Sequence, residues 1–175
     1  AVVGHKALYS NTTGQFNSAL GHSALYSNTT ASNNVAVGYE AMVTNTTGTQ
    51  HVAMGRQALY SNTTGDQNTA IGQRALYDNT TGEYNVALGY SSLENNTTAS
   101  YNVAVGYQAG LANTTAAQGT FVGETAGYSN TTGLGNTFVG SDSGHLNTTG
   151  TRNQFFGKNS GESITTGSKN SILGA

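Results

Sequence analysis

Apolar residues return along this chain in short clusters, each followed by a glycine, and the clusters lie seventeen residues apart. Val103, Ala104, Val105 and Gly106 form one such cluster. Short apolar runs bounded by Asn and Gly are typical of buried β-strands, since they are too short for helices. The pattern therefore predicts one short strand in every seventeen residues.

The glycines that end these clusters define a repeating unit, in which we count the glycine as slot 1. They are Gly4, Gly21, Gly38, Gly55, Gly72, Gly89, Gly106, Gly123, Gly140, Gly157 and Gly174. Ten units follow one another without insertion or deletion. Seventeen residues are too few for a helical-pair repeat or a propeller blade, but they suit one coil of a solenoid. We predict an all-β fold, a parallel β-solenoid or β-roll of ten 17-residue coils, with these glycines as a structural ladder.

Comparison of the ten units shows which slots are constrained. Slots 16 and 17 are apolar in every unit, so we expect a strand from about slot 15 to slot 1 that is buried on both faces. Slot 14 is Asn except at His51 and Gly119, which predicts a left-handed backbone turn there. Slot 11 is Gly or Ala, which predicts a second tight corner.

One correlated exchange divides the array. Slot 5 is Leu or Met in the first six units and Gly in the last four, whereas slot 16 changes from Ala to Phe or Ile. Opposite changes in size imply that the two slots fill a common space. We therefore treat residues 1–175 as a single array with two sub-blocks, 1–105 and 106–175.

The charge content limits the partners. Only 8% of residues are charged, the net charge is −2, and the six basic residues are scattered, so nucleic acid is not an expected partner. There is no run of eighteen apolar residues, so this segment is not expected to insert into a membrane. The chain starts at Ala1 without a signal peptide, and we expect it to be an excerpt of a longer protein.

No constellation typical of catalysis is present. The acids recur in no fixed slot, and Gly-rich corners in every unit do not indicate a phosphate loop. His5 and His22, one coil apart at slot 2, are a weak metal hypothesis. We expect no enzyme activity, no catalytic residues, no cofactor and no metal site.

The Asn-Thr-Thr tripeptides at slots 8–10 allow three interpretations. The first is a structural turn whose side chains stack on their equivalents one coil away. The second is N-glycosylation at the acceptor asparagines, for which each tripeptide has the required sequence. These are Asn11, Asn28, Asn45, Asn62, Asn79, Asn96, Asn113, Asn130 and Asn147. The third is an ice-binding face made of two Thr columns, which requires slots 9 and 10 to sit in a turn.

Two resemblances appear at the strand and its turn. The segments 34–38, 102–106 and 170–174 resemble the S-V-A-I-G repeat of trimeric autotransporter adhesin heads (YadA-like). The unit 68–82 is similar to repeats of bacterial surface and phage tail-fibre-like proteins, and this similarity covers the whole chain. The first family implies a left-handed parallel β-roll that assembles as a trimer.

These observations lead to a functional expectation. We expect a parallel homotrimeric fibre segment, the shaft or head of an extracellular adhesin or tail-fibre-like appendage, located at a cell surface or on a virion. Its partners would be copies of itself in a trimer or filament, and a host-cell or matrix surface. The alternatives are an ice-binding β-solenoid and a glycan-coated matrix filament.

Overall fold

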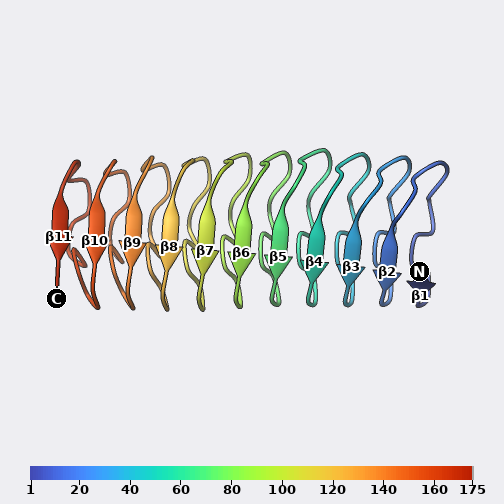
Figure 1. Ribbon diagram of the computed structural model, residues 1–175, viewed down its shortest axis with the longest axis horizontal. Coiled ribbons are helices and arrows are strands. Elements are labelled where there is room, and N and C mark those ends of the chain that lie inside the picture. Colours follow the sequence, from blue (N-terminus) through green and yellow to red (C-terminus); the bar gives the residue numbers. More distant parts are fainter. Residues whose placement is uncertain (175) are drawn as a thin grey trace.

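The chain forms one solenoid with a single sheet along one side. The computed structural model describes residues 1–174, which carry eleven parallel strands that pair in sequence order (Figure 1). The strands are β1 (Val2–Val3), β2 (Ser18–Leu20), β3 (Val35–Val37), β4 (Val52–Met54), β5 (Thr69–Ile71), β6 (Val86–Leu88), β7 (Val103–Val105), β8 (Thr120–Val122), β9 (Thr137–Val139), β10 (Gln154–Phe156) and β11 (Ser171–Leu173). The predicted all-β parallel β-solenoid is confirmed, with the strand at slots 15–17.

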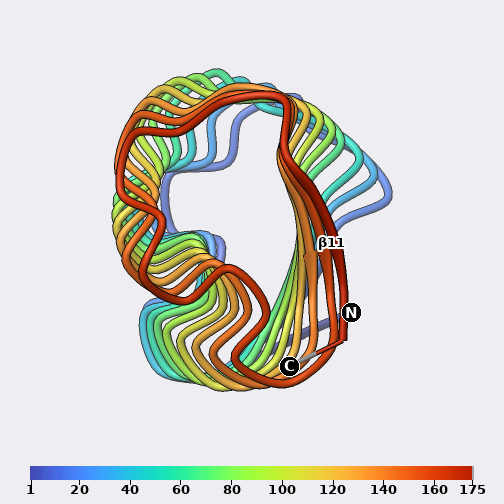
Figure 2. The same cartoon turned by 90° about the vertical axis from the view of Figure 1, so that its left-hand side faces the viewer.

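The register between coils is constant. Every strand residue pairs with the residue seventeen positions away, as Val86 does with Val103. Backbone hydrogen bonds join the coils outside the sheet as well, for example from the amide of Thr80 to the carbonyl of Thr97 at 2.8 Å. Viewed end-on, the coils lie over one another with a steady rotation from each to the next (Figure 2). Each coil is therefore tied to its two neighbours around its whole perimeter.

The strands bury one face only. Slot 16 points inward, and Ala36, Ala53 and Phe121 are fully buried. Slots 15 and 17 point outward, so Leu20 is 50% exposed and Leu88 is 43% exposed. The expectation that both faces are buried is therefore wrong for the single chain, because alternation along a strand sends slot 17 away from the interior.

Left-handed backbone conformations occur at four slots of every coil. They are slots 1, 3, 5 and 13, represented by Gly72, Arg74, Leu76 and Tyr84 in one coil. The predicted left-handed turn at slot 14 is wrong, since the positive φ angle lies one residue earlier. Slot 14 conserves Asn for hydrogen bonding instead, as described below.

Slot 1 is always glycine for two reasons that act together. Gly72 has a φ of +135°, which side chains rarely allow, and a Cβ atom there would collide with the carbonyl oxygen of Gly89 in the next coil. The same close approach recurs along the glycine ladder. At slot 11 an added Cβ on Gly65 would likewise meet the carbonyl oxygen of Gly82, so space is short there, although Ala31, Ala99 and Ala116 occupy this slot in other coils. The bend itself lies at slots 9 and 10.

The two sub-blocks fill the interior differently, and the predicted contact between slots 5 and 16 is confirmed. In the first six coils a Leu or Met at slot 5 packs beside Ala at slot 16. In the later coils a ring takes that space: a Cβ atom on Gly144 would lie 2.6 Å from Phe138 Cδ2. Phe138 and Phe155 stack at 4.9 Å between ring centroids, and the sheet continues through residue 106 without a break.

The first ring of this stack explains an exception at slot 14. Phe121 is tilted by 42° relative to Phe138, and a Cβ atom on Gly119 would lie 2.6 Å from Phe121 Cζ. Gly119 therefore makes room for a tilted ring, and it has no positive φ angle. Where the filling changes, both slot 5 and slot 14 lose their side chains to accommodate Phe121.

Candidate functional site

The chemistry-bearing side chains lie in columns that run along the solenoid. Within residues 1–174, no three His, Asp or Glu side chains lie close enough together to hold a metal ion. His5 and His22 do meet, but their rings stack at 5.1 Å between centroids, so ring faces converge rather than nitrogens. Also within residues 1–174, no helical segment has the length and hydrophobicity that a membrane crossing needs. The candidate functional features are therefore the columns themselves.

The slot 8 asparagines form a ladder inside the coil. Asn79 Nδ2 donates to Asn62 Oδ1 in the preceding coil at 2.9 Å and to the carbonyl of Gly82 at 3.1 Å. Asn96 repeats this contact onto Asn79 Oδ1 at 2.8 Å. Asn28, Asn45, Asn62, Asn79, Asn96, Asn113, Asn130 and Asn147 are all fully buried, and Asn11 in the first coil is half-buried. This geometry agrees with the structural interpretation of the Asn-Thr-Thr tripeptides.

The same burial bears on the glycosylation interpretation. A glycan replaces a hydrogen on Nδ2, the atom that in seven of these eight buried side chains donates hydrogen bonds within the interior. The closed coil around these atoms has no space for a sugar. Glycosylation at those positions is therefore incompatible with the folded coil.

A second ladder runs along slot 14, where the chain enters each strand. Asn68 Oδ1 accepts from the amide of Asn85 at 2.9 Å, and Asn68 Nδ2 donates to the carbonyl of Gly82 at 2.8 Å. The side chain thus satisfies backbone groups of the next coil that the strand leaves unpaired. Asn is favoured at slot 14 because it carries an acceptor and a donor at the required separation.

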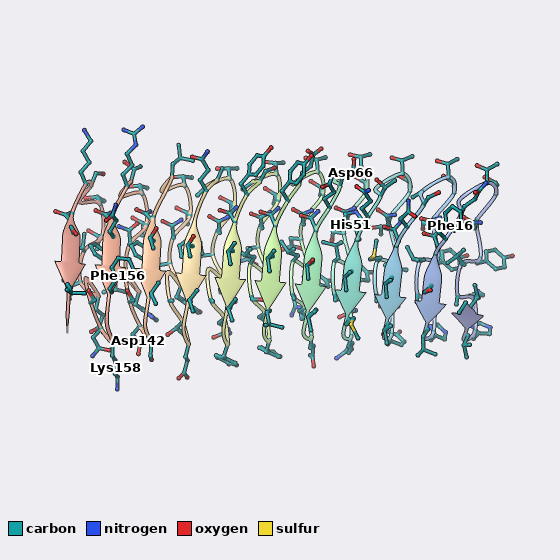
Figure 3. All side chains as sticks on the ribbon, viewed as in Figure 1. Phe16, His51, Asp66, Asp142, Phe156 and Lys158 are labelled. Carbon is teal, nitrogen blue, oxygen red and sulfur yellow. The ribbon has the colours of Figure 1, made fainter. Side chains whose placement is uncertain are left out.

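His51 replaces Asn in this ladder and reproduces its hydrogen bonds. His51 Nδ1 accepts from the amide of Asn68 at 3.0 Å, and Nε2 donates to the carbonyl of Gly65 at 2.7 Å. An amide only donates and a carbonyl only accepts, so the ring is neutral with its proton on Nε2. Burial lowers the pKa of His51 to about 4, although the hydrogen bond to Gly65 acts in the opposite direction. In Figure 3, Asp66 lies at the upper rim of the coils and His51 lies just below it.

The two Thr columns differ in exposure. Slots 9 and 10 sit in a bend, and the slot 9 hydroxyls donate to carbonyls of the next coil, as Thr80 Oγ1 does to Thr97 at 3.0 Å. The slot 10 side chains, such as Thr81 and Thr98, are exposed in every coil. One Thr column is therefore open to water, and the other is tied to the backbone.

The charged residues and the tyrosines lie outside the strands, on the rims of the coil. Arg74 pairs with Glu94 at 2.7 Å and lies over the ring of Tyr77 at 4.5 Å. Burial, followed by the nearby Glu94 carboxylate, raises the pKa of Asp78 above its usual value. In Figure 3, Asp142 and Lys158 project from the lower rim, away from the strands. These contacts join neighbouring coils and do not converge on a cavity.

The outward face of the sheet is the most distinctive surface. We call the side chains at slots 15 and 17 of β2–β11 the outer face. Slot 17 is apolar in all ten coils and slot 15 is Val, Thr, Ser or Gln, so the outer face carries no charge. The sequence signals this surface as a run of apolar residues, but it does not distinguish an outward face from a buried one. Sequence reasoning therefore assigned slot 17 to the core.

No protein-family model matches this chain, and no curated protein and no solved structure matches it either.

Proposed function

We propose that this chain is a structural segment of an extracellular fibre, the shaft or head of an adhesin or tail-fibre-like appendage. Its role is to project a tip or to present a repeated surface for attachment. The observation that carries the proposal is the constant register of eleven strands, each paired with the residue seventeen positions away. A coil that repeats without change makes a rod whose length is set by the number of coils.

The side-chain ladders support a mechanical role. Asn at slots 8 and 14 and Thr at slot 9 hydrogen-bond from coil to coil over most of the chain. Such contacts act between neighbours only, so coils can be added or removed without changing the cross-section. The similarity of the strand and turn segments to adhesin-head and tail-fibre-like repeats supports placement at a cell surface or on a virion. It also supports assembly as a parallel homotrimer.

Deletion of whole coils tests the spacer role. Removal of residues 72–88 joins slot 17 of one unit to slot 1 of the next, so the rod should refold and shorten by about 4.8 Å. Small-angle scattering measures the longest dimension, and circular dichroism reports the fold. A matched deletion of residues 72–80, which breaks the register, should uncouple the coils on either side and lower the temperature of thermal unfolding. A register-preserving deletion that fails to fold, or leaves the length unchanged, would contradict a modular spacer.

Surface location requires a separate experiment. Antibodies raised against the folded chain should label intact cells or particles of the source without permeabilisation. Labelling that appears only after lysis would contradict an extracellular appendage. An antibody against an internal protein serves as the control for leakage.

The exposed slot 10 column favours ice binding as a second candidate. Ten Thr side chains lie in line at intervals of about 4.8 Å along the solenoid. Thermal hysteresis at millimolar concentration would support this function, and Thr81→Lys together with Thr98→Lys should then reduce it. Absence of hysteresis in the unmodified chain would dismiss it.

A further inference from the structure

The outer face is constrained to be apolar although it is open to water in the single chain. Slot 17 carries Val, Leu, Ile, Met or Phe in ten coils of ten, and Leu20, Met54, Leu88 and Phe156 are 38–50% exposed. Strand propensity alone does not explain this, because slot 15 on the same face accepts Ser, Thr and Gln in six coils. An apolar requirement at an exposed position indicates a surface that is covered in the working assembly.

The chain keeps charge away from this surface. All fourteen charged residues occupy slots 2, 3, 6, 7, 12 and 13, and none lies within a strand. In the central coils, exposed aromatic side chains flank the strands on both sides, with Tyr90 and Tyr107 at slot 2 and Tyr84 and Tyr101 at slot 13. The same two slots carry charged residues in other coils, so charge is absent from the strands but not from their edges. Depletion of charge in the centre and enrichment of aromatic residues are typical of protein interfaces.

We propose that the outer face binds the outer face of a second copy of this chain. The occupant has to offer apolar groups along the whole length of ten coils, which rise roughly 50 Å. A copy of this solenoid has the same rise per coil, so its slot 15 and slot 17 side chains repeat at the same interval over the full length. A compact globular partner matches such a stripe only locally.

The size of the outer face is adequate for this role. A stripe of about 50 Å by about 10 Å, three residues wide, offers roughly 500 Å² from each copy. The flanking slot 2 and slot 13 aromatic side chains extend it toward the roughly 800 Å² per partner that stable interfaces bury. Slot 17 keeps an apolar residue on this stripe in all ten coils, which a patch formed by chance on a monomer would not require.

The second copy is the partner of the proposed fibre segment, and its biological setting rests on that proposed function. The physical claim stands apart from it, because a lone rod could also act as a spacer. If the coil-deletion or surface-labelling experiments fail, the proposed fibre function is wrong, but the contact between two outer faces can still be tested. If the chain is monomeric but still forms a rod, the proposed interface is wrong and the spacer role stands.

Light scattering on the 175-residue chain is the first measurement. The expected mass is a multiple of 17.9 kDa that persists on dilution into the micromolar range. The double variant Leu88→Glu with Val105→Glu places two charges on neighbouring rungs of the outer face, and association should weaken at least tenfold. The matched control, Thr81→Glu with Thr98→Glu, adds the same charge at the exposed slot 10 of nearby coils, and its mass should be unchanged. Circular dichroism should show the same fold for both, because slots 10 and 17 lie outside the interior.

A labelling experiment locates the contact independently of orientation. The chain has no cysteine, so Val105→Cys and Thr115→Cys each create a single thiol. Alkylation of Cys at slot 17 should be slow in the assembled protein and fast after dilution to monomer, while the slot 10 thiol should react fast throughout. A monomeric unmodified chain at all concentrations, equal assembly of the two glutamate variants, or equal alkylation rates would each overturn the proposal. Binding of the monomer to phosphatidylcholine vesicles would likewise assign the face to lipid instead.

Discussion

The coils before Gly106 and those after it have the same backbone but opposite interiors. In the first six, Leu or Met at slot 5 adopts φ angles of 49–54°, a left-handed conformation that costs a side-chain-bearing residue roughly 1–2 kcal/mol. In the last four, Gly at slot 5 has φ angles of 60–63°, and a larger residue at slot 16 fills the space. The backbone turn therefore stays the same whether or not the residue favours it.

This difference shows what determines the path of the chain. The hydrogen bonds between coils repeat in both sub-blocks, as from Leu76 to Ser92 and from Gly127 to Ser143. Burial of the Leu side chain offsets the backbone strain in the first sub-block, whereas the second avoids the strain and buries a ring instead. The interior is thus interchangeable as long as its volume is conserved, which is what close packing requires.

The largest expected effect on stability comes from changing the residues at the boundary between the two kinds of interior, near Gly106. Phe121→Ala leaves a cavity and Gly110→Leu overpacks the space beside Phe121, since an added Cβ would lie 2.7 Å from that ring. Each single change should lower the free energy of unfolding by about 3–5 kcal/mol. The double variant moves the Leu-to-Phe boundary one coil later and should recover part of that loss, because Asn136, unlike Gly119, carries a side chain at slot 14 of that coil.

Denaturant unfolding of the four proteins in this cycle measures the coupling between the two sites. Strictly additive losses would show that slots 5 and 16 do not share a space.

Acid should destabilise the first sub-block more than the second, because buried His51 in the first has no counterpart in the second. The pKa of His51 is about 4 in the folded chain and about 6.5 when unfolded, so its contribution is complete above pH 6.5. As the pH falls toward 4 the unfolded chain takes up a proton first, and about 3 kcal/mol of stability should be lost. Hydrogen exchange should show the coils around His51 opening before those after Gly106.

His51→Asn restores the common ladder residue and provides the matched control. This variant should lose the acid-dependent step between pH 6.5 and 4 while keeping its stability at pH 7. An unchanged pH profile would mean that another group causes the transition.

The slot 8 asparagine ladder contains one residue, Asn79, that hydrogen-bonds to both neighbouring coils, and another, Asn147, that makes no side-chain hydrogen bond. Asn79→Ala removes three hydrogen bonds and leaves buried polar groups without partners, so it should lower the free energy of unfolding by about 2 kcal/mol. Asn147 is equally buried, but its side-chain atoms have no hydrogen-bond partner. Ile164 in the following coil has no donor for Asn147 Oδ1, and Asn130 Oδ1 in the preceding coil accepts from Asn136 Nδ2. Asn147→Ala should therefore be close to neutral when the thermal unfolding of both variants is measured. Equal losses would mean that volume, not hydrogen bonding, explains the conserved Asn.

Relief of backbone strain should have the smallest effect. Gln118 at slot 13 has a φ of +61° and an exposed side chain, while Gly135 occupies the same slot one coil later. Gln118→Gly should raise the free energy of unfolding by about 0.5 kcal/mol. Thr115→Gly, at a slot without a positive φ angle, should instead lower it, and a reversed order would contradict the strain at slot 13.

The sequence was sufficient for the period, the strand and the exchange between slots 5 and 16, because ten units sample every slot. It did not distinguish the inward slot 16 from the outward slot 17, since both are apolar. It also attributed Asn at slot 14 to a turn, because the same residue type suits a left-handed backbone and a buried hydrogen-bond ladder. The left-handed residues at slots 3 and 13, such as Arg74 and Tyr84, carry no compositional signal because contacts between coils impose that conformation.

The hydrogen bonds that join the coils run along the solenoid axis, and this direction governs the response to a pulling force. Coil junctions connected in series each bear the full tension between the two ends, so the weakest junction opens first. Each coil that peels away replaces a rise of about 4.8 Å with about 60 Å of extended chain. A rod built in this way takes up a sudden load by lengthening one junction at a time.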